Sequence, residues 1–141
     1  MQAVAALSRD IIGRHGIEAR HVLAHSDIAP GRKIDPGEKF DWKGLAASGV
    51  GQWVPPADLD ADNGLTLENR QDAIAEAQRL LSLYGYKVET HGVLDEATQI
   101  VLKAFQLHFR QARPDGRLDR STLDTLSRLA SMTQKSPEAI G

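Results

Sequence analysis

The sequence predicts an α+β chain in two parts, a mixed N-terminal segment and a small all-α second part. Near residue 25, a short apolar run is followed by turns rich in Pro and Gly, which is typical of a strand that ends in a loop. Around Pro55-Pro56 the chain loses all periodicity. After Gly64, apolar residues recur in three stretches at helical spacing.

These features divide the 141 residues into four ranges. We expect the mixed segment over 1–53, a linker over 54–64, a three-helix domain over 65–132 and a tail over 133–141. A chain of this length has room for one ordinary domain or two very small ones.

The first expected element is a helix over residues 2–12. Gly13 and Gly16 supply its stop signals. A short strand over 22–24 should follow and lead directly into His25. The helix is predicted by apolar residues near the 3.6-residue period, namely Ala3, Val4, Leu7, Ile11 and Ile12.

The middle of the chain, from Ala46 to Gly64, is the best linker in the sequence. It is rich in Gly, Pro and Asp, and Pro55-Pro56 disfavours both helix and central strand. Because a large indole is seldom left in solvent, Trp53 indicates that the linker docks on one of its neighbours. Phe40 and Trp42, which precede it, are either core anchors or part of the wall of a site.

Three helices are expected after the linker. They cover about 68–83, 95–109 and a stretch that begins near Asp119. Asp95 and Asp119 are good N-caps, because a carboxylate there accepts otherwise unpaired backbone N–H groups. The three apolar stripes are Ala73, Ala77, Leu80, Leu81 and Tyr84; Ala97, Ile100, Val101, Ala104, Phe105 and His108; and Leu123, Leu126, Leu129 and Ala130.

A weak internal repeat, G-x-L-D-x-x-T, covers residues 92–98 and 116–122. Each copy combines a turn glycine, a buried leucine, a helix cap and a hydroxyl in the first helical turn. The repeat therefore predicts two equivalent helix starts in the second part of the chain.

The candidate chemistry lies in residues 25–37, HSDIAPGRKIDPG. Turns at Pro30-Gly31 and Pro36-Gly37 can fold this loop back and bring His25 and Asp35 to one point. An imidazole nitrogen with a carboxylate oxygen is a sensible partial zinc shell, and Lys33 would be a fixed positive charge beside it. The alternative is an ordinary polar loop.

On these residues the chain resembles the zinc-dependent N-acetylmuramoyl-L-alanine amidases of the type 2, AmpD/AmiD-like, family. In that family a His, a Lys eight positions later and an Asp ten positions later close the active site. The resemblance implies that His25 and Asp35 bind zinc, and that Lys33 is catalytic and stabilises charge on the substrate carbonyl oxygen. It also implies a peptidoglycan hydrolase that cleaves the amide between N-acetylmuramic acid and L-alanine of the stem peptide.

Upstream of the loop, the chain departs from the family pattern. The family takes a further His ligand and a catalytic Glu from that region, and neither has a matching position here. His15 lies where a helix ends, and His21 would be about 13 Å from His25 along a strand, too far for a common ion. We therefore expect residues 1–53 to be the incomplete C-terminal segment of an α/β zinc amidase domain, inactive alone. The alternative is a non-catalytic peptidoglycan-binding protein with a remnant amidase segment.

The helical part resembles the three-helix peptidoglycan-binding module of cell-wall hydrolases. The resemblance rests on the repeat, on L-x-x-Y-G-Y at 81–86 and on A-F-Q-x-H-F at 104–109. It implies peptidoglycan or muropeptides as partners. A helix-turn-helix DNA-binding domain is the competing interpretation, but a basic recognition face is missing. We expect the arginine cluster to be mainly solvated, with contact to an anionic wall peptide as the alternative: Arg110, Arg113, Arg117 and Arg120.

Composition narrows the function classes further. A net charge of −2 gives no electrostatic case for nucleic acid, and no apolar run reaches the length of a membrane span. The absence of cysteine excludes disulfides and thiolate metal sites. No secretory signal is visible, but the amidase resemblance implies the periplasm or cell envelope. His108 is expected to be packed and His91 to lie in a turn, neither of them a metal ligand.

Overall fold

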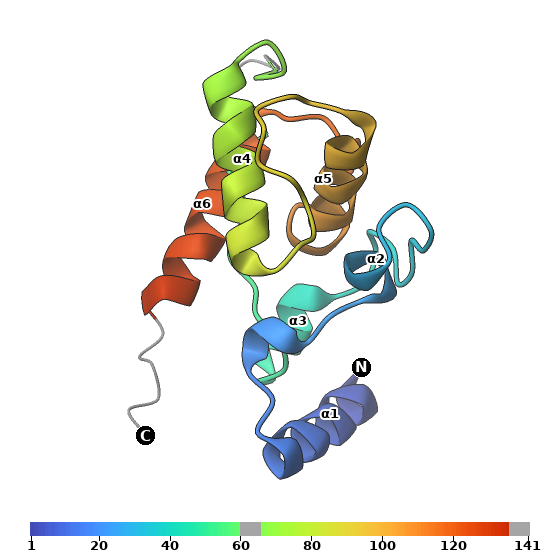
Figure 1. Ribbon diagram of the computed structural model, residues 1–141. Helices are drawn as coiled ribbons and strands as arrows, with labels where there is room; N and C mark the ends of the chain where they lie inside the picture. Colours follow the sequence, from blue (N-terminus) through green and yellow to red (C-terminus); the bar gives the residue numbers. More distant parts are fainter. Residues whose placement is uncertain (60–65, 136–141) are drawn as a thin grey trace.

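The computed structural model describes residues 1–59 and 66–135, and their regular structure is helical (Figure 1). In these ranges there is an isolated bridge between Thr66 and Asp119 but no strand. The elements in chain order are α1 Gln2–His15, the 3-10 turn η1 Ala19–His21, α2 His25–Ile28, α3 Trp42–Ala47, α4 Gln71–Tyr84, α5 Glu96–Phe109 and α6 Arg120–Lys135.

The strand expected over residues 22–24 is wrong. These residues form an irregular connection, and His25 begins the single helical turn α2. The α+β class is therefore not confirmed within the part of the chain that is described. An apolar triplet cannot form a strand without a neighbour to complete its hydrogen bonds.

Helices α4, α5 and α6, with their connections, form what we call the three-helix unit, residues 66–135. In Figure 1, α4 lies alongside α6, and α5 stands beside them. Phe105 is fully buried near the middle of its apolar core. The core also contains Leu81, Leu102, Phe109, Leu118, Leu126 and Leu129, each at most 1% exposed.

Both predicted N-caps are confirmed. The Asp95 carboxylate accepts the backbone N–H of Thr98 at 2.9 Å, and the Asp119 carboxylate accepts that of Thr122 at 2.8 Å. Helix α4 begins at Gln71 rather than at residue 68, because residues 66–70 are taken up by the bridge and a turn.

The N-terminal segment, residues 1–59, packs around a smaller core of Ala5, Ala24, Trp42, Leu45 and Val50. Helix α1 runs past the expected end at residue 12 and through Gly13 to His15, and it ends at Gly16, the second of the two expected stop signals, which has a left-handed φ of 61°. Its apolar stripe is mostly outside the core, because Val4, Leu7 and Ile11 are 47%, 62% and 42% exposed.

The connection between the two parts is docked, as Trp53 predicts. Trp53 packs against both cores, and Val54 is buried in the core of the three-helix unit. The backbone of Ala57 is hydrogen-bonded on both sides, to Thr125 at 2.9 Å and to Ser121 at 2.8 Å. Residues 60–64 of the expected linker and 136–141 of the expected tail lie outside the described residues.

One arginine of the cluster does not behave as the sequence predicts. Arg110, expected to be solvated, is 1% exposed and pairs with Asp119 at 3.1 Å. Arg117 and Arg120 do have exposed side chains. Its contacts with Asp119 and Thr122 at the start of α6 therefore bury one member of a cluster that looks uniform in sequence.

Candidate functional site

The loop of residues 25–37 folds back on itself and brings its imidazole and one of its carboxylates together. His25 Nδ1 lies 2.6 Å from Asp35 Oδ2. The backbone N–H of Ser26 also donates to the carbonyl of Asp35 at 3.2 Å, which holds the two ends of the loop side by side. Both side chains are open to solvent, with 68% and 60% of their surfaces exposed.

The electrostatics of this pair favour a charged carboxylate. The pKa of Asp35 is lowered from its ordinary value, mainly by the hydrogen bond with His25 and further by the positive charge of Lys33. Lys33 is thus close enough to act on Asp35. An exposed imidazole beside an ionised carboxylate, with an ammonium nearby, can bind a cation or act on an anionic substrate.

The loop rests on the three-helix unit at Gly31. This residue has a φ of 79°, and a Cβ added to it would lie 2.9 Å from Cγ2 of Ile100 on α5. Only glycine combines this backbone conformation with so close an approach. Helix α5 therefore forms the support on which the loop turns.

Asp27, inside the same loop, is a residue that the sequence analysis missed. Its side chain is 2% exposed and accepts hydrogen bonds from Tyr86 and His108 of the three-helix unit. The sequence feature that could have identified Asp27 is its position three residues after Ala24. At this spacing an acidic side chain can accept the backbone N–H of the residue that caps the helix. Its partners are 59 and 81 residues away, beyond any local pattern.

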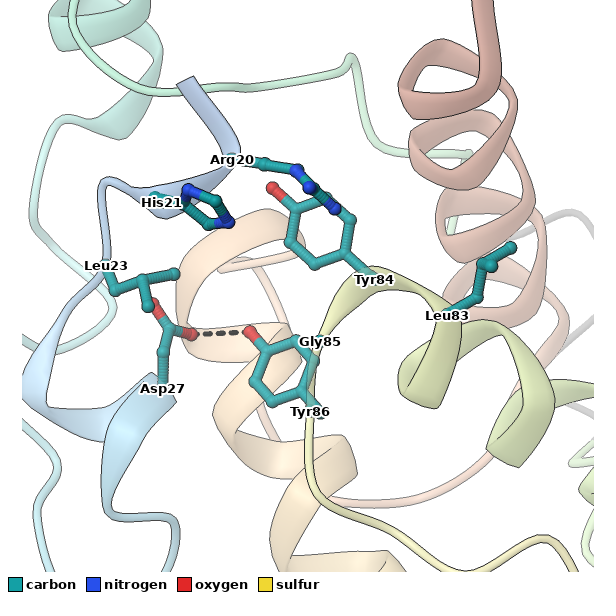
Figure 2. A pocket seen from close by; sticks show the side chains of 8 residues that line it. All are labelled: Arg20, His21, Leu23, Asp27, Leu83, Tyr84, Gly85 and Tyr86. Carbon is teal, nitrogen blue, oxygen red and sulfur yellow. Dashed lines mark hydrogen bonds between the residues drawn. The ribbon is translucent and has the colours of Figure 1, made fainter. Parts of the chain in front are cut away.

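A pocket of about 220 Å³ lies where the N-terminal segment meets the end of α4. Figure 2 shows Tyr84 and Tyr86 facing His21 and Asp27, with the Arg20 side chain extending toward Tyr84, and the hydrogen bond between Tyr86 and Asp27. Burial raises the pKa of both tyrosines, and the charge of Asp27 adds to it. Both phenols therefore stay protonated and act as donors.

The remaining histidines lie on other elements than His25. His15 is at the end of α1 and His21 in η1, while His91 contacts Gln78 and Asp95 in the turn before α5. His108 is packed, as expected, and is 2% exposed. Among residues 1–59 and 66–135, no group of three or more His, Cys, Asp or Glu side chains could hold a metal ion.

Comparison with known proteins shows which proteins the chain resembles. Residues 70–126 match the family described as "Putative peptidoglycan binding domain". The chain is 36% identical over 122 residues to the N-acetylmuramoyl-L-alanine amidase AmiD of Escherichia coli (strain K12), covering 86% of this chain and 44% of AmiD. The chain is a homologue of the AmiD and AmpD amidases.

Solved structures agree with this family assignment. AmpDh3 of Pseudomonas aeruginosa superposes with a TM-score of 0.74 at 33% identity, covering 94% of this chain and 52% of that one. The complex of AmiD from E. coli with the substrate anhydro-N-acetylmuramic acid-L-Ala-D-gamma-Glu-L-Lys gives a TM-score of 0.69 at 34% identity, covering 93% and 51%. The chain thus spans about half the length of the AmiD-type relatives that it matches.

Proposed function

We propose that this AmiD homologue contributes the His25–Asp35 loop to a zinc-dependent N-acetylmuramoyl-L-alanine amidase. One observation carries the proposal: His25 Nδ1 and Asp35 Oδ2 are 2.6 Å apart, in a chain that aligns with AmiD over most of its length. His25 and Asp35 would be zinc ligands and Lys33 a catalytic residue. The bond cleaved would be the amide between N-acetylmuramic acid and L-alanine of the stem peptide.

The donor types of the loop suit zinc. Imidazole nitrogen and carboxylate oxygen are both common zinc ligands, and a hydrolytic site usually takes three protein ligands and leaves one position open. Within the described ranges the loop supplies two of these donors. The proposal therefore requires a third donor from beyond the described residues.

Within such a site, the residues of this chain have separate tasks. Zinc, when bound, polarises the scissile carbonyl and acidifies a water molecule. The hydrogen bond with His25 lowers the pKa of Asp35 further below its ordinary value, so its carboxylate is ionised and available as a ligand at neutral pH. The Lys33 ammonium would stabilise the negative charge that develops on the carbonyl oxygen of the substrate.

We further propose that the range 65–132 acts as a peptidoglycan-binding domain and that the protein works on peptidoglycan or muropeptides. The family match over 70–126 supports this, as does the muropeptide named in the AmiD complex. We propose with it a location in the periplasm or cell envelope, where such substrates occur. Among residues 1–59 and 66–135, no helix is long and apolar enough to cross a membrane.

A second candidate function is a peptidoglycan-binding protein without catalysis, in which the loop is a remnant. This candidate is favoured because, within the described residues, the loop supplies two zinc donors. A zinc ion with two protein ligands lacks half of its usual four-ligand shell. Zinc content and amidase activity separate the two candidates. We expect residues 1–141 alone to retain little zinc and to show no turnover.

The decisive experiment uses the full-length natural protein with a muramoyl-peptide substrate. His25→Ala and Asp35→Ala should each lose zinc, because each removes a ligand. Lys33→Ala should keep zinc but lose about 10²–10³ in kcat, roughly 3 kcal/mol, since it removes only a contact to developing charge. Lys39→Ala, an exposed lysine four residues after Asp35, is the matched control and should be unchanged. Full activity without zinc would contradict the proposal.

A further inference from the structure

Asp27 is the most heavily hydrogen-bonded side chain in the loop. Oδ2 accepts the backbone N–H of Ala24 at 2.9 Å and lies 2.8 Å from His108 Nδ1, while Oδ1 accepts the Tyr86 hydroxyl at 2.5 Å. With its side chain 2% exposed, this carboxylate depends on these three partners for its charge to be tolerated.

Two of the three partners belong to the three-helix unit and are themselves fixed. His108, in the last turn of α5, is stacked between Trp42 at 3.7 Å and Phe109 at 3.9 Å, measured between ring centroids. Since a carboxylate only accepts, His108 Nδ1 carries the proton of this hydrogen bond. Burial and the charge of Asp27 hold the pKa of Tyr86 well above its usual value, so its hydroxyl remains a donor.

The third partner connects Asp27 to the proposed zinc ligand. Ala24 is the N-cap of α2, and His25 is the first residue of that helix. A helix of four residues is not stable by itself, so α2 depends on the bond between Asp27 and the Ala24 N–H. The orientation of His25 toward Asp35 therefore depends on contacts made by Tyr86 and His108, in addition to the backbone hydrogen bond between Ser26 and Asp35.

We propose that His108 and Tyr86 are positioning residues, through which the three-helix unit sets the orientation of His25 by way of Asp27. The three-helix unit then supports the site, in addition to any role that it has in binding the cell wall. This inference rests on the proposed function only where it names His25 a zinc ligand. The packing of Gly31 on Ile100 and the hydrogen bond from Gln111 to the carbonyl of Phe40, 2.8 Å, belong to the same contact surface.

The test compares variants that keep or remove the donor at position 108 in the metal-free chain. His108→Asn keeps an amide donor that can reach Asp27, and His108→Leu fills similar space without one. The readout is the two-bond ¹H–¹⁵N spectrum of the His25 ring, calibrated with Asp35→Ala, in which the hydrogen bond to His25 is absent. We expect the Nδ1 signal in His108→Leu to move at least halfway to the Asp35→Ala position, and His108→Asn to stay near the unsubstituted chain.

Two further variants separate positioning from general loss of stability. Leu126→Ala removes a buried side chain of α6, outside the network, and should lower the melting temperature without moving the His25 signal. Tyr86→Phe keeps the ring, loses one donor to Asp27 and should move the signal in the same direction as His108→Leu. If His108→Leu does not melt cooperatively, Tyr86→Phe decides. An unmoved signal in a folded donor-free variant, or an equal shift in Leu126→Ala, would overturn the inference.

A zinc titration of the full-length protein gives the second readout. His108→Leu should raise the dissociation constant for zinc by about tenfold, the low end of what loss of a supporting contact costs. If the unsubstituted protein does not bind zinc, the proposed function fails, while the spectra of His25 still decide whether His108 and Tyr86 position it.

Discussion

Arg110 shows, at the scale of one residue, how burial changes the contribution of a charged side chain to stability. Its Nη2 donates to Thr122 at 2.7 Å and lies 3.1 Å from Asp119, with 1% of the side chain exposed. Removing one member of a buried ion pair leaves an uncompensated group and typically costs about 3–5 kcal/mol. Because Arg113 also contacts Asp119, at 2.7 Å, Arg110→Ala should lower the free energy of unfolding by up to that amount but by more than the about 1 kcal/mol of an exposed pair, measured by urea denaturation.

Arg117 provides the matched control, because it comes from the same sequence cluster. Its side chain is 57% exposed and pairs with Glu68 at 3.2 Å. Arg117→Ala should cost less than about 1 kcal/mol, as exposed pairs do. Equal losses in the two variants would contradict the importance that we give to burial.

Asp119 gives the chain a specific sensitivity to acid. Burial alone raises the pKa of Asp119, but hydrogen bonds from Thr122 and Arg113 and the charge of Arg110 hold it below its ordinary value of 3.8. Because the folded pKa lies below the unfolded one, the stabilisation is present above the unfolded pKa and is lost as pH falls through the folded pKa. Melting temperatures measured from pH 6 downward should fall below about pH 4, and less steeply in Asp119→Asn. Parallel curves would refute this.

At the scale of elements, the internal repeat is completed by a glutamine that the motif does not contain. Gln78 Nε2 donates to Thr98 at 3.0 Å, and Gln106 Nε2 donates to Thr122 at 3.0 Å. Each glutamine also accepts the N–H of the repeat glycine, Gly92 at 2.9 Å and Gly116 at 2.7 Å. The two helix starts are thus held by the same set of hydrogen bonds.

This equivalence predicts similar losses of stability when either of the two glutamines is replaced. Gln78→Leu and Gln106→Leu each leave a buried glycine N–H without its acceptor, which costs about 1–3 kcal/mol. Urea unfolding should give two losses of similar size. As a control, Gln99→Leu changes an exposed glutamine of α5 and should change stability by less than about 0.5 kcal/mol. A loss at only one of the two repeat positions would show that the copies are not equivalent.

The elements that the sequence predicts correctly are those specified locally. The starts of α5 and α6 follow from Asp95 and Asp119, whose caps reach only three residues along the chain. The end of α1 at Gly16 is equally local. By contrast, residues 22–24 form an irregular connection instead of the expected strand, and α2 after them is held through Asp27 by His108, 81 residues away. Contacts at such separations leave no periodic trace in the sequence.

At the scale of the whole molecule, the candidate site also combines a part specified by nearby residues with a part that depends on distant ones. The approach of His25 to Asp35 could be predicted, because the turn at Pro30-Gly31 lies between them and the turn at Pro36-Gly37 directly follows Asp35. The supporting contacts could not, since they join the loop to α5 and to the end of α4. The sequence suggests two parts separated by a linker, whereas in the described residues a buried polar network and Trp53 pack them together.

The core of the three-helix unit should determine whether the chain holds peptidoglycan. Phe105 is fully buried and packs against Phe109 with ring centroids 5.2 Å apart. Phe105→Ala should cost about 3–5 kcal/mol, a large part of the total stability of a chain this size. Thermal melting should show a strongly lowered or absent transition.

Binding to purified sacculi, measured by sedimentation, should depend on this core and not on metal. We expect the chain to sediment with sacculi equally well with and without EDTA, because the three-helix unit is built from an apolar core and hydrogen-bonded caps. His25→Ala, which alters only an exposed loop side chain, should sediment like the unsubstituted chain, whereas Phe105→Ala should remain in the supernatant. Release of the chain by EDTA would show instead that the His25–Asp35 loop takes part in holding the wall, and a folded chain that never sediments would remove the wall-binding role altogether.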